Sequence, residues 1–200
     1  MEPMTFRVEN RKRIYMTKED YLLLPHKNFS TVKSIVPELK NNVKIKFGSI
    51  IDAIILGEKL PEQDNIEGLD QYEIAVAARE ILKFLKKFEN QIQEKHVKIT
   101  ANYTNGFLTL PVKGEIDMLT SDAVIEVKTT SVKKQDFQKL VKKMKYHYQL
   151  AHYTWLANKT LAFWLVYFRK EKSVELVSFD KKMLKETNDF WHECILLYGN

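Results

Sequence analysis

The spacing of apolar residues changes about half-way along the chain, from a helical period to a strand period. Up to residue 95, apolar residues recur mainly every three or four positions, as on one face of a helix. Helices are therefore predicted over residues 17–24, 49–57 and about 70–94, the last with an apolar face that continues to Ile92. An acidic stretch containing Pro and Gly, residues 57–71, is predicted to be an exposed loop.

After residue 95 the apolar residues alternate with polar ones, which is typical of strands. Three strands joined by tight turns at 104–106 and 120–122 are predicted over residues 96–103, 107–119 and 123–130. A lysine-rich helix and a second helical stretch follow over about 135–157, then a strand hairpin over 161–179 and a last helix from Asp180 to about residue 197. This order predicts an α/β fold with a mixed central sheet flanked by helices.

Composition sets limits on this picture. With 200 residues, 44% hydrophobic and 29% charged, the chain fits one soluble domain over residues 1–200, mostly helical over 1–95 and with its sheet core over 96–200. A net charge of +6 and a pI near 9.1 suit a nucleic-acid partner but do not establish one. The single cysteine, Cys194, excludes an internal disulfide or a multi-cysteine metal site. Neither a signal peptide nor a membrane segment is expected, which predicts an intracellular protein without membrane contact.

The stretch GEIDMLTSDAVIEVKTTS, residues 114–131, places charged side chains in segments that otherwise resemble buried strands. Glu126 and Lys128 point to the same face of their strand, and the turn at 120–122 brings Asp117 from the preceding strand close to Glu126. Two neighbouring carboxylates repel unless a cation lies between them, and oxygen ligands suit Mg²⁺ or Mn²⁺. Lys128 can then hold a phosphate or orient an attacking water. On spacing alone, a surface salt bridge on an exposed sheet edge explains the residues equally well.

Two other segments bear on that choice. Asp52 is the only charge in FGSIIDAIILG, so it needs a partner, either a salt bridge or a metal ion. Residues 133–145 hold six lysines, Lys139, Lys142 and Lys143 among them, against one acid. Such a segment suits a phosphate backbone, although most charge runs are simply solvated faces.

In chain order, Gly-x-Ile-Asp, eight residues, Glu-x-Lys-Thr-Thr and then Tyr-x-x-Gln-x-x-x-Tyr resemble the RecB-type branch of the PD-(D/E)XK nuclease superfamily. Within it the sequence most resembles the RecE-type and lambda-exonuclease-like enzymes of phage recombination. The similarity is best over about residues 47–153, and the segments NFSTVKSI and FGSIIDAIILG also resemble the N-terminal helices of the family. The resemblance implies the restriction-endonuclease-like core of that superfamily.

The resemblance also implies roles for individual residues. Asp117 and Glu126 would be metal ligands, with the carbonyl group of Val127 as a further oxygen donor, and Lys128 would be the catalytic lysine. The remaining matches lie on the substrate side: Thr129 and Thr130 near the scissile strand, and Gln149 and Tyr153 on a helix over the active site.

One position departs from the family pattern. This chain has Asp52 where the family usually has a histidine, and neither His26, His147 nor His152 offers a clear replacement. An aspartate also binds Mg²⁺, so Asp52 is predicted as a third acidic metal ligand.

The expected function is therefore a Mg²⁺-dependent deoxyribonuclease, with Mn²⁺ as another suitable metal, that degrades linear duplex DNA from its ends. Two alternatives stay open: a nuclease-fold protein that binds DNA or a partner without catalysis, and an endonuclease with the same chemistry. The resemblance further implies a cytoplasmic protein of a bacterium or a phage-infected cell, with a single-strand annealing protein or further copies of itself as partners.

Overall fold

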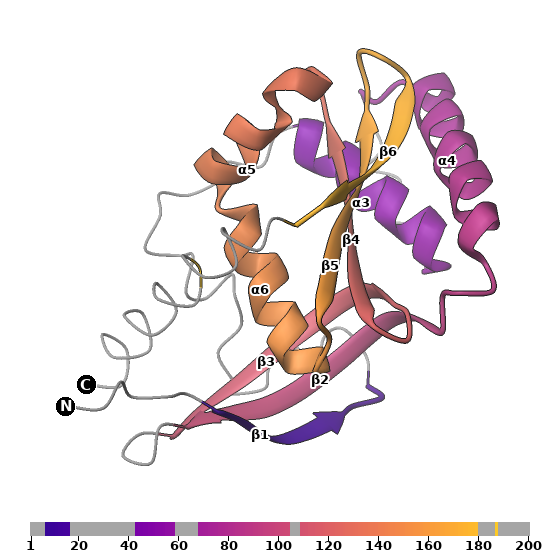
Figure 1. The fold of residues 1–200 in the computed structure, drawn as a ribbon. Helices are drawn as coiled ribbons and strands as arrows, with labels where there is room; N and C mark the ends of the chain where they lie inside the picture. The colour runs from indigo at the N-terminus through magenta and orange to yellow at the C-terminus, as the bar shows by residue number, and fades with distance from the viewer. Residues whose placement is uncertain (1–6, 17–42, 59–67, 105–108, 180–186, 188–200) are drawn as a thin grey trace.

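One mixed sheet organises the protein (Figure 1). The computed structural model describes residues 7–16, 43–58, 68–104 and 109–179, and Thr187. The strands are β1 (Arg7–Arg13), β2 (Glu94–Thr104), β3 (Thr109–Leu119), β4 (Ala123–Thr130), β5 (Leu161–Phe168) and β6 (Ser173–Ser178). The described helices are α3 (Val43–Leu56), α4 (Gln71–Leu85), α5 (Phe137–Met144) and α6 (Tyr146–Ala157). The sheet order is β1-β2-β3-β4-β5-β6, and only β4 and β5 run parallel.

The predicted α/β fold with a mixed sheet flanked by helices is confirmed. The three-stranded meander, the β5–β6 hairpin, the helix around residues 49–57 and the two helices within 135–157 all form. The predicted helix over 17–24 and nearly all of the last predicted helix lie outside the described residues. Within the described part of the chain, none of the helices is long and apolar enough to span a membrane.

The prediction of one helix over residues 70–94 is confirmed as far as Leu85 and is wrong for the residues after it. After α4 ends, a short 3₁₀ helix (Lys86–Phe88) leads into a turn, in which the N–H groups of Gln91 and Ile92 both bond to the carbonyl group of Phe88. Ile92 packs against the core from this turn, and β2 begins two residues later. Ile92 therefore fits the helical spacing of apolar residues in the sequence, although it lies in a turn and not in a helix.

Two apolar clusters cover the two faces of the sheet. On one face, α3 and α4 pack against side chains such as Ile125 and Val127 of β4. On the other face, α5 and α6 pack against Val124 and neighbouring residues. Figure 1 shows the two helix pairs on opposite sides of β4 and β5. Residues of β4 with odd and even numbers thus face different helices, which places Glu126 and Lys128 on the side of α6.

The sheet forks at the end of β3. Backbone pairing between β3 and β4 is confined to Met118 with Ile125 and Leu119 with Val124. Ile116 lies in the cluster beside α6, whereas Met118 lies in the cluster beside α3, although residues two apart in a regular strand share a face. The β3 strand therefore twists at Asp117, next to the position where its pairing with β4 begins. In Figure 1, β4 rises away from the long β2–β3 ribbon at this point.

Gly114 allows α6 to lie very close to β3. A Cβ atom at this position would be 2.5 Å from Cδ1 of Leu156 and 3.1 Å from the ring of Tyr153. Both side chains belong to α6 and are buried. The glycine of the Gly-x-Ile-Asp motif therefore sets the distance between the sheet and the helix that carries Gln149 and Tyr153.

Candidate active site

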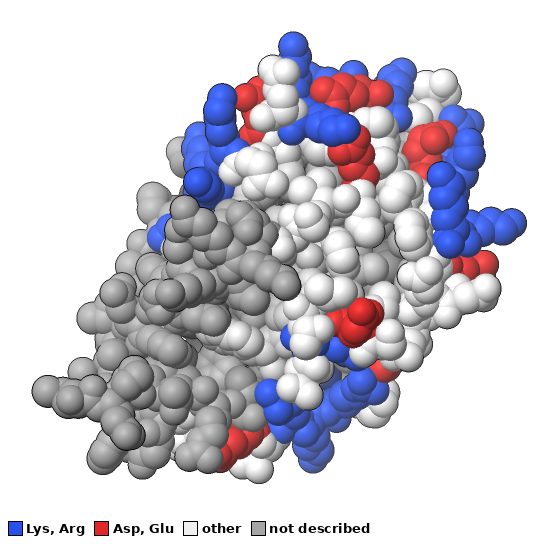
Figure 2. Space-filling model, viewed as in Figure 1, with Lys and Arg blue, Asp and Glu red and all other residues white. Residues whose placement is uncertain are grey.

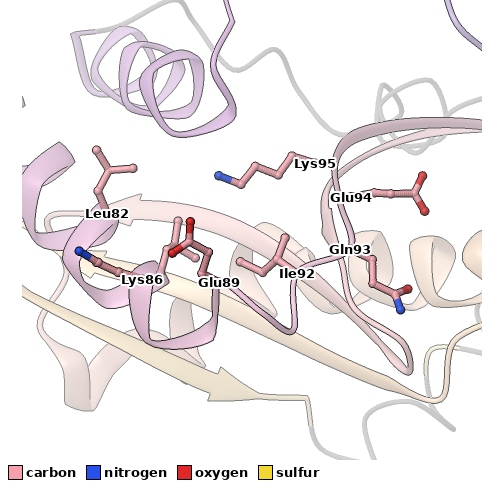
Figure 3. A pocket seen from close by; sticks show the side chains of 8 residues that line it. Leu82, Lys86, Glu89, Ile92, Gln93, Glu94 and Lys95 are labelled. Carbon is pink, nitrogen blue, oxygen red and sulfur yellow. The ribbon is translucent and has the colours of Figure 1, made fainter.

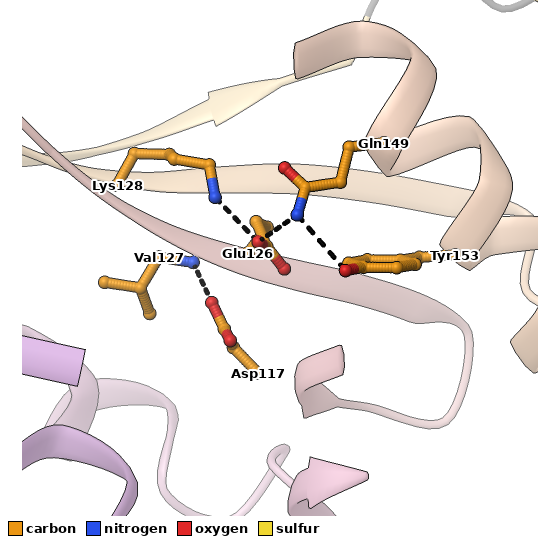
Figure 4. Close-up of polar contacts among 6 residues, drawn as sticks. All are labelled: Asp117, Glu126, Val127, Lys128, Gln149 and Tyr153. Carbon is orange, nitrogen blue, oxygen red and sulfur yellow. Dashed lines mark hydrogen bonds and ion pairs between the residues drawn. The ribbon is translucent and has the colours of Figure 1, made fainter. Parts of the chain in front are cut away.

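Asp117 occupies the fork between β3 and β4. Its Oδ2 accepts a hydrogen bond of 2.7 Å from the backbone N–H of Val127 (Figure 4). Because the two strands have separated here, the side-chain carboxylate takes the place of the backbone acceptor that a continued ladder would supply. The sequence-based expectation that Asp117 and Glu126 lie close together agrees with this geometry, and the two carboxyl groups influence each other's ionisation.

Glu126 is held from β4 and from α6. Lys128 Nζ donates to Glu126 Oε1 at 2.6 Å, and Gln149 Nε2 donates to the same oxygen at 2.9 Å. Gln149 Nε2 also lies 3.1 Å from the hydroxyl group of Tyr153, one helical turn further along α6. Figure 4 shows the α6 side chains pointing down onto Glu126. The structure thus gathers the predicted acids, the lysine and the Gln-x-x-x-Tyr pair into one connected cluster with Asp117.

In the absence of a cation, the two carboxyl groups are difficult to ionise together. Burial raises the pKa of Asp117 well above its usual value, and the charge of Glu126 raises it further. Burial also raises the pKa of Glu126, against the opposing effect of Lys128. Burial alone would lower the pKa of Lys128, but the charges of Glu126 and Asp117 outweigh it and raise that pKa. Lys128 is therefore an ammonium group at neutral pH.

One oxygen of Glu126 indicates where a cation fits. Oε1 accepts two hydrogen bonds, whereas Oε2 is buried and has no hydrogen-bond partner among the described residues. A buried carboxylate oxygen without a partner is costly unless an ion satisfies it. A divalent cation shared by Glu126 and Asp117 would supply that partner and remove the repulsion between the two carboxylates. Their oxygen donors are the ligands that Mg²⁺ and Mn²⁺ prefer.

Asp52 approaches the cluster from α3. It is half-buried, and its charge contributes to raising the pKa of Glu126 and of Lys128. Asp52, Asp117 and Glu126 do not form a group in which one oxygen from each lies within 4.8 Å of the other two; among the described residues just one such group of three is found, and it lies elsewhere. Asp52 as a third ligand therefore remains a prediction.

A cavity of about 390 Å³ opens beside the cluster. Its lining combines α3, β4 and α5, with Asp52, Lys128, Thr129 and Thr130 among the residues that were predicted from the sequence. Thr130 Oγ1 accepts a hydrogen bond from the N–H of Val132, which fixes the turn after β4. The cavity thus brings Asp52 and Lys128 to a common space that is open to solvent.

Two further residues that line this cavity had no predicted role. Tyr146 lies on α6 one turn before Gln149, and Lys128 Nζ is 5.3 Å from its ring centroid. It is the first tyrosine of the Tyr-x-x-Gln-x-x-x-Tyr pattern, so the helical spacing could have revealed it. Arg169 follows β5 and makes two hydrogen bonds to Glu73 of α4. It reaches the cavity only because β5 pairs with β4, and no local spacing signals that.

Sequence comparison identifies the family. The family model of the PD-(D/E)XK nuclease superfamily matches residues 38–192. The chain belongs to the PD-(D/E)XK nuclease superfamily. The mixed sheet with flanking helices is consistent with the fold of that superfamily, and membership implies a metal-dependent nuclease with DNA as its substrate.

Other comparisons of this PD-(D/E)XK protein are more distant. The structure of a protein called SSO0001 is 16% identical, with a TM-score of 0.40, and the match covers 91% of this chain and 87% of that one. The structure of a phage-related exonuclease from Haemophilus somnus 129PT is 15% identical, with a TM-score of 0.32, over 70% of this chain and 88% of that one. No curated protein matches the sequence. Likeness this weak supports no conclusion about substrate or cleavage polarity.

The predicted DNA-contacting lysines of this PD-(D/E)XK protein lie on α5, next to the cavity. Lys139, Lys142 and Lys143 are all exposed, and Lys139 pairs with Asp136 at 3.1 Å. Leu140 and Met144 of the same helix line the cavity. Figure 2 shows Lys and Arg side chains, interspersed with Asp and Glu, along the upper rim where Figure 1 places α5 and the β5–β6 turn, and further Lys and Arg side chains at the right and lower edges.

A larger cavity, of about 480 Å³, lies away from these residues (Figure 3). It is formed by the end of α4 and the beginning of β2, with Lys86, Glu89, Glu94 and Lys95 in its lining. None of the predicted catalytic residues contributes to it. The predicted catalytic residues of the PD-(D/E)XK protein lie instead at or beside the smaller cavity, whose lining includes Lys128.

Proposed function

We propose that this protein is a Mg²⁺-dependent deoxyribonuclease that degrades linear duplex DNA from its ends, as the resemblance to RecE-type and lambda-exonuclease-like enzymes suggests. The observation that carries the proposal is the buried, unpartnered Oε2 of Glu126 beside Asp117, with the ammonium group of Lys128 on the other oxygen. A divalent cation held by these carboxylates would supply the remaining component for phosphodiester hydrolysis.

Asp117, Glu126 and the carbonyl group of Val127 are the proposed ligands, with Asp52 as a further acid on the α3 side. A bound Mg²⁺ would lower the pKa of a water molecule and stabilise negative charge that develops on the phosphate. The hydrogen bond from the N–H of Val127 fixes the orientation of Asp117 before any ion binds. Gln149 in turn holds the Glu126 carboxylate against the sheet.

Lys128 has the proposed role of a charged hydrogen-bond donor. Because its pKa is raised, Lys128 keeps its proton at neutral pH and does not act as a general base in the cation-free protein. It can orient the attacking water and stabilise charge on the phosphate oxygens. Thr129 and Thr130, in the cavity lining, are proposed to contact the strand that is cut, with Gln149 and Tyr153 above it.

A cleavage assay on end-labelled linear duplex DNA and on closed-circular DNA tests this function. We expect Mg²⁺-dependent degradation of the linear substrate and none of the circle, because an exonuclease needs an end. Asp117→Ala should lower the rate by about 10³-fold or more, since ligands of one catalytic unit are not replaceable singly. Cutting of the circle would support an endonuclease instead. Binding of DNA without any cleavage would support the non-catalytic alternative, for which the departure at Asp52 is the motivating feature.

The α5 lysines give a separate prediction about DNA binding. Lys142→Gln combined with Lys143→Gln should weaken binding to duplexes of unrelated sequence equally, and should reduce the slope of log K against log salt by about 2, one unit per lost phosphate contact. Fluorescence anisotropy with Ca²⁺ in place of Mg²⁺ measures both effects. The matched control is Lys83→Gln with Lys86→Gln, two exposed lysines of the α4 end. Equal slopes for the two double variants would show that α5 is only a solvated face.

A further inference from the structure

A second cluster of metal-ligating side chains lies outside the proposed active site, where the chain after α3 meets the β2–β3 ribbon. His96 of β2 lies between two carboxylates: its Nδ1 contacts Glu58 Oε1, and its Nε2 contacts Glu115 Oε1 of β3. One ligand atom from each residue lies within 4.8 Å of the others, which holds for this group alone among the residues that the structure describes.

The backbone places these side chains in specific ways. His96 has a φ of 53°, in the left-handed region, and interrupts the regular pairing of β2 with β3 between Lys95 and Val97. Gly57 has a φ of 75° and ends α3, and the N–H of Glu58 closes back on the carbonyl group of Ala53 at 2.8 Å. The cluster therefore joins the end of α3, the helix of Asp52, to the ribbon that carries Asp117.

Among the described residues, His96 is the one basic side chain that pairs with the two acids of the cluster. Neither Glu58 nor Glu115 forms an ion pair with a lysine or arginine within the described ranges, and each has His96 as its partner. The three side chains are only 23–25% exposed, so solvent screens them incompletely. Two carboxylates and one imidazole thus share a partly buried site that a divalent cation would neutralise.

We propose that this cluster binds a divalent transition-metal ion of the Zn²⁺ class, separate from the cation of the proposed active site. His96 Nε2 and Glu115 are the protein ligands, and water completes the coordination. Glu58 accepts the Nδ1–H of His96 and orients the ring, as second carboxylates do at histidine–metal sites. An imidazole nitrogen favours Zn²⁺ or Co²⁺ over Mg²⁺, which prefers an all-oxygen shell. The ion would hold the end of α3 against β2 and β3.

The test uses the full chain with Asp117→Asn and Glu126→Gln, so that the proposed active site no longer competes for ions. After treatment with a chelator, titration calorimetry with Zn²⁺ should show one bound ion, and Mg²⁺ should not displace it. Co²⁺ should bind with the visible absorption of a nitrogen- and oxygen-ligated ion. In this background, His96→Asn and Glu115→Gln should each weaken Zn²⁺ binding by about 100-fold or more. Glu58→Gln should weaken it by about 10-fold, as loss of an orienting partner does.

Two features keep the result interpretable. Asn tolerates a positive φ, so His96→Asn removes the ligand while keeping the backbone, and Glu115→Gln lies in a regularly paired part of β3. Glu94→Gln removes the same charge from β2 outside the cluster and should leave Zn²⁺ affinity unchanged. If the background protein binds no Zn²⁺, or His96→Asn binds it equally well, the cluster is an ion-paired clamp and the proposal is wrong. Neither result depends on nuclease activity, so the proposed function is tested separately.

Discussion

Asp117→Asn is expected to abolish cleavage and, at the same time, to make the cation-free protein more stable. Asparagine keeps an oxygen that can accept the N–H of Val127, but it removes the charge whose burial beside Glu126 is unfavourable. Glu126 and Lys128 remain as a balanced ion pair. We expect a loss of activity of about 10³-fold or more and a gain of about 0.5–2 kcal/mol in the free energy of unfolding with a chelator present.

The stability difference should depend on pH in a defined direction. The raised pKa values mean that Asp117 and Glu126 bind more protons in the folded than in the unfolded state, above the usual carboxyl pKa. The contribution of these two groups to the free energy of unfolding is therefore fully present at low pH. It falls as the pH rises through the raised pKa values of the folded state. Thermal unfolding at about pH 5 and about pH 8 should show this fall in the wild type and a smaller one in Asp117→Asn. Mg²⁺ should stabilise the wild type more at the higher pH.

A control at an exposed acid separates this effect from a general change in charge. Glu89→Gln removes one negative charge from the exposed end of α4, so its unfolding curve should follow the wild type at both pH values. If Asp117→Asn is less stable than the wild type with chelator at the higher pH, the two carboxylates are not in conflict. The reason for placing a cation between them would then disappear.

Gly114→Ala should have the largest effect of any one-carbon change in the sheet. The added Cβ would lie 2.5 Å from Leu156 and 3.1 Å from the ring of Tyr153. Overpacking of this kind costs about 1–3 kcal/mol, because α6 must move away from β3. The movement would carry Gln149 away from Glu126 and so reduce cleavage by about 10-fold or more, as misplaced supporting groups do. Chemical denaturation and the cleavage assay measure the two losses.

A double variant tests whether the clash is the cause. Leu156→Ala alone should destabilise the protein, because Leu156 is fully buried in the α6 cluster. Gly114→Ala with Leu156→Ala should cost less than the sum of the two single changes by about 1 kcal/mol or more, since the smaller side chain leaves room for the new methyl group. Strictly additive losses would mean that the glycine serves some other purpose.

Local patterns were sufficient to predict much of the fold but only part of the site. The β3–β4 segment could be interpreted because its core residues alternate with Asp117, Glu126 and Lys128, so the strand period itself exposes the charges. Gln149 and Tyr153 could also be predicted, because residues four apart share one face of a helix. Both sets depend on spacing within one element or across one tight turn.

The features that were missed depend on contacts between distant segments. The strand β1 was not predicted, because residues Glu9 to Lys12 are all exposed, without alternation of buried and exposed side chains, and pair with β2 through the backbone. His96 and its two acids come from a loop and two strands, so no motif joins them. Arg169 likewise lies far along the chain from the β4 residues beside it.

Lys145 separates two helices that differ in exposure and in their contacts with the sheet. This residue alone separates α5 from α6, and its left-handed conformation, with a φ of 57°, interrupts the helix at one position. The residues before it carry the exposed lysines, whereas those after it are tied to the sheet through Gly114 and Glu126. With the α5 lysines in their proposed role as DNA contacts, a change in the length or charge of α5 would alter how DNA is approached while leaving the hydrogen bonds around Glu126 in place.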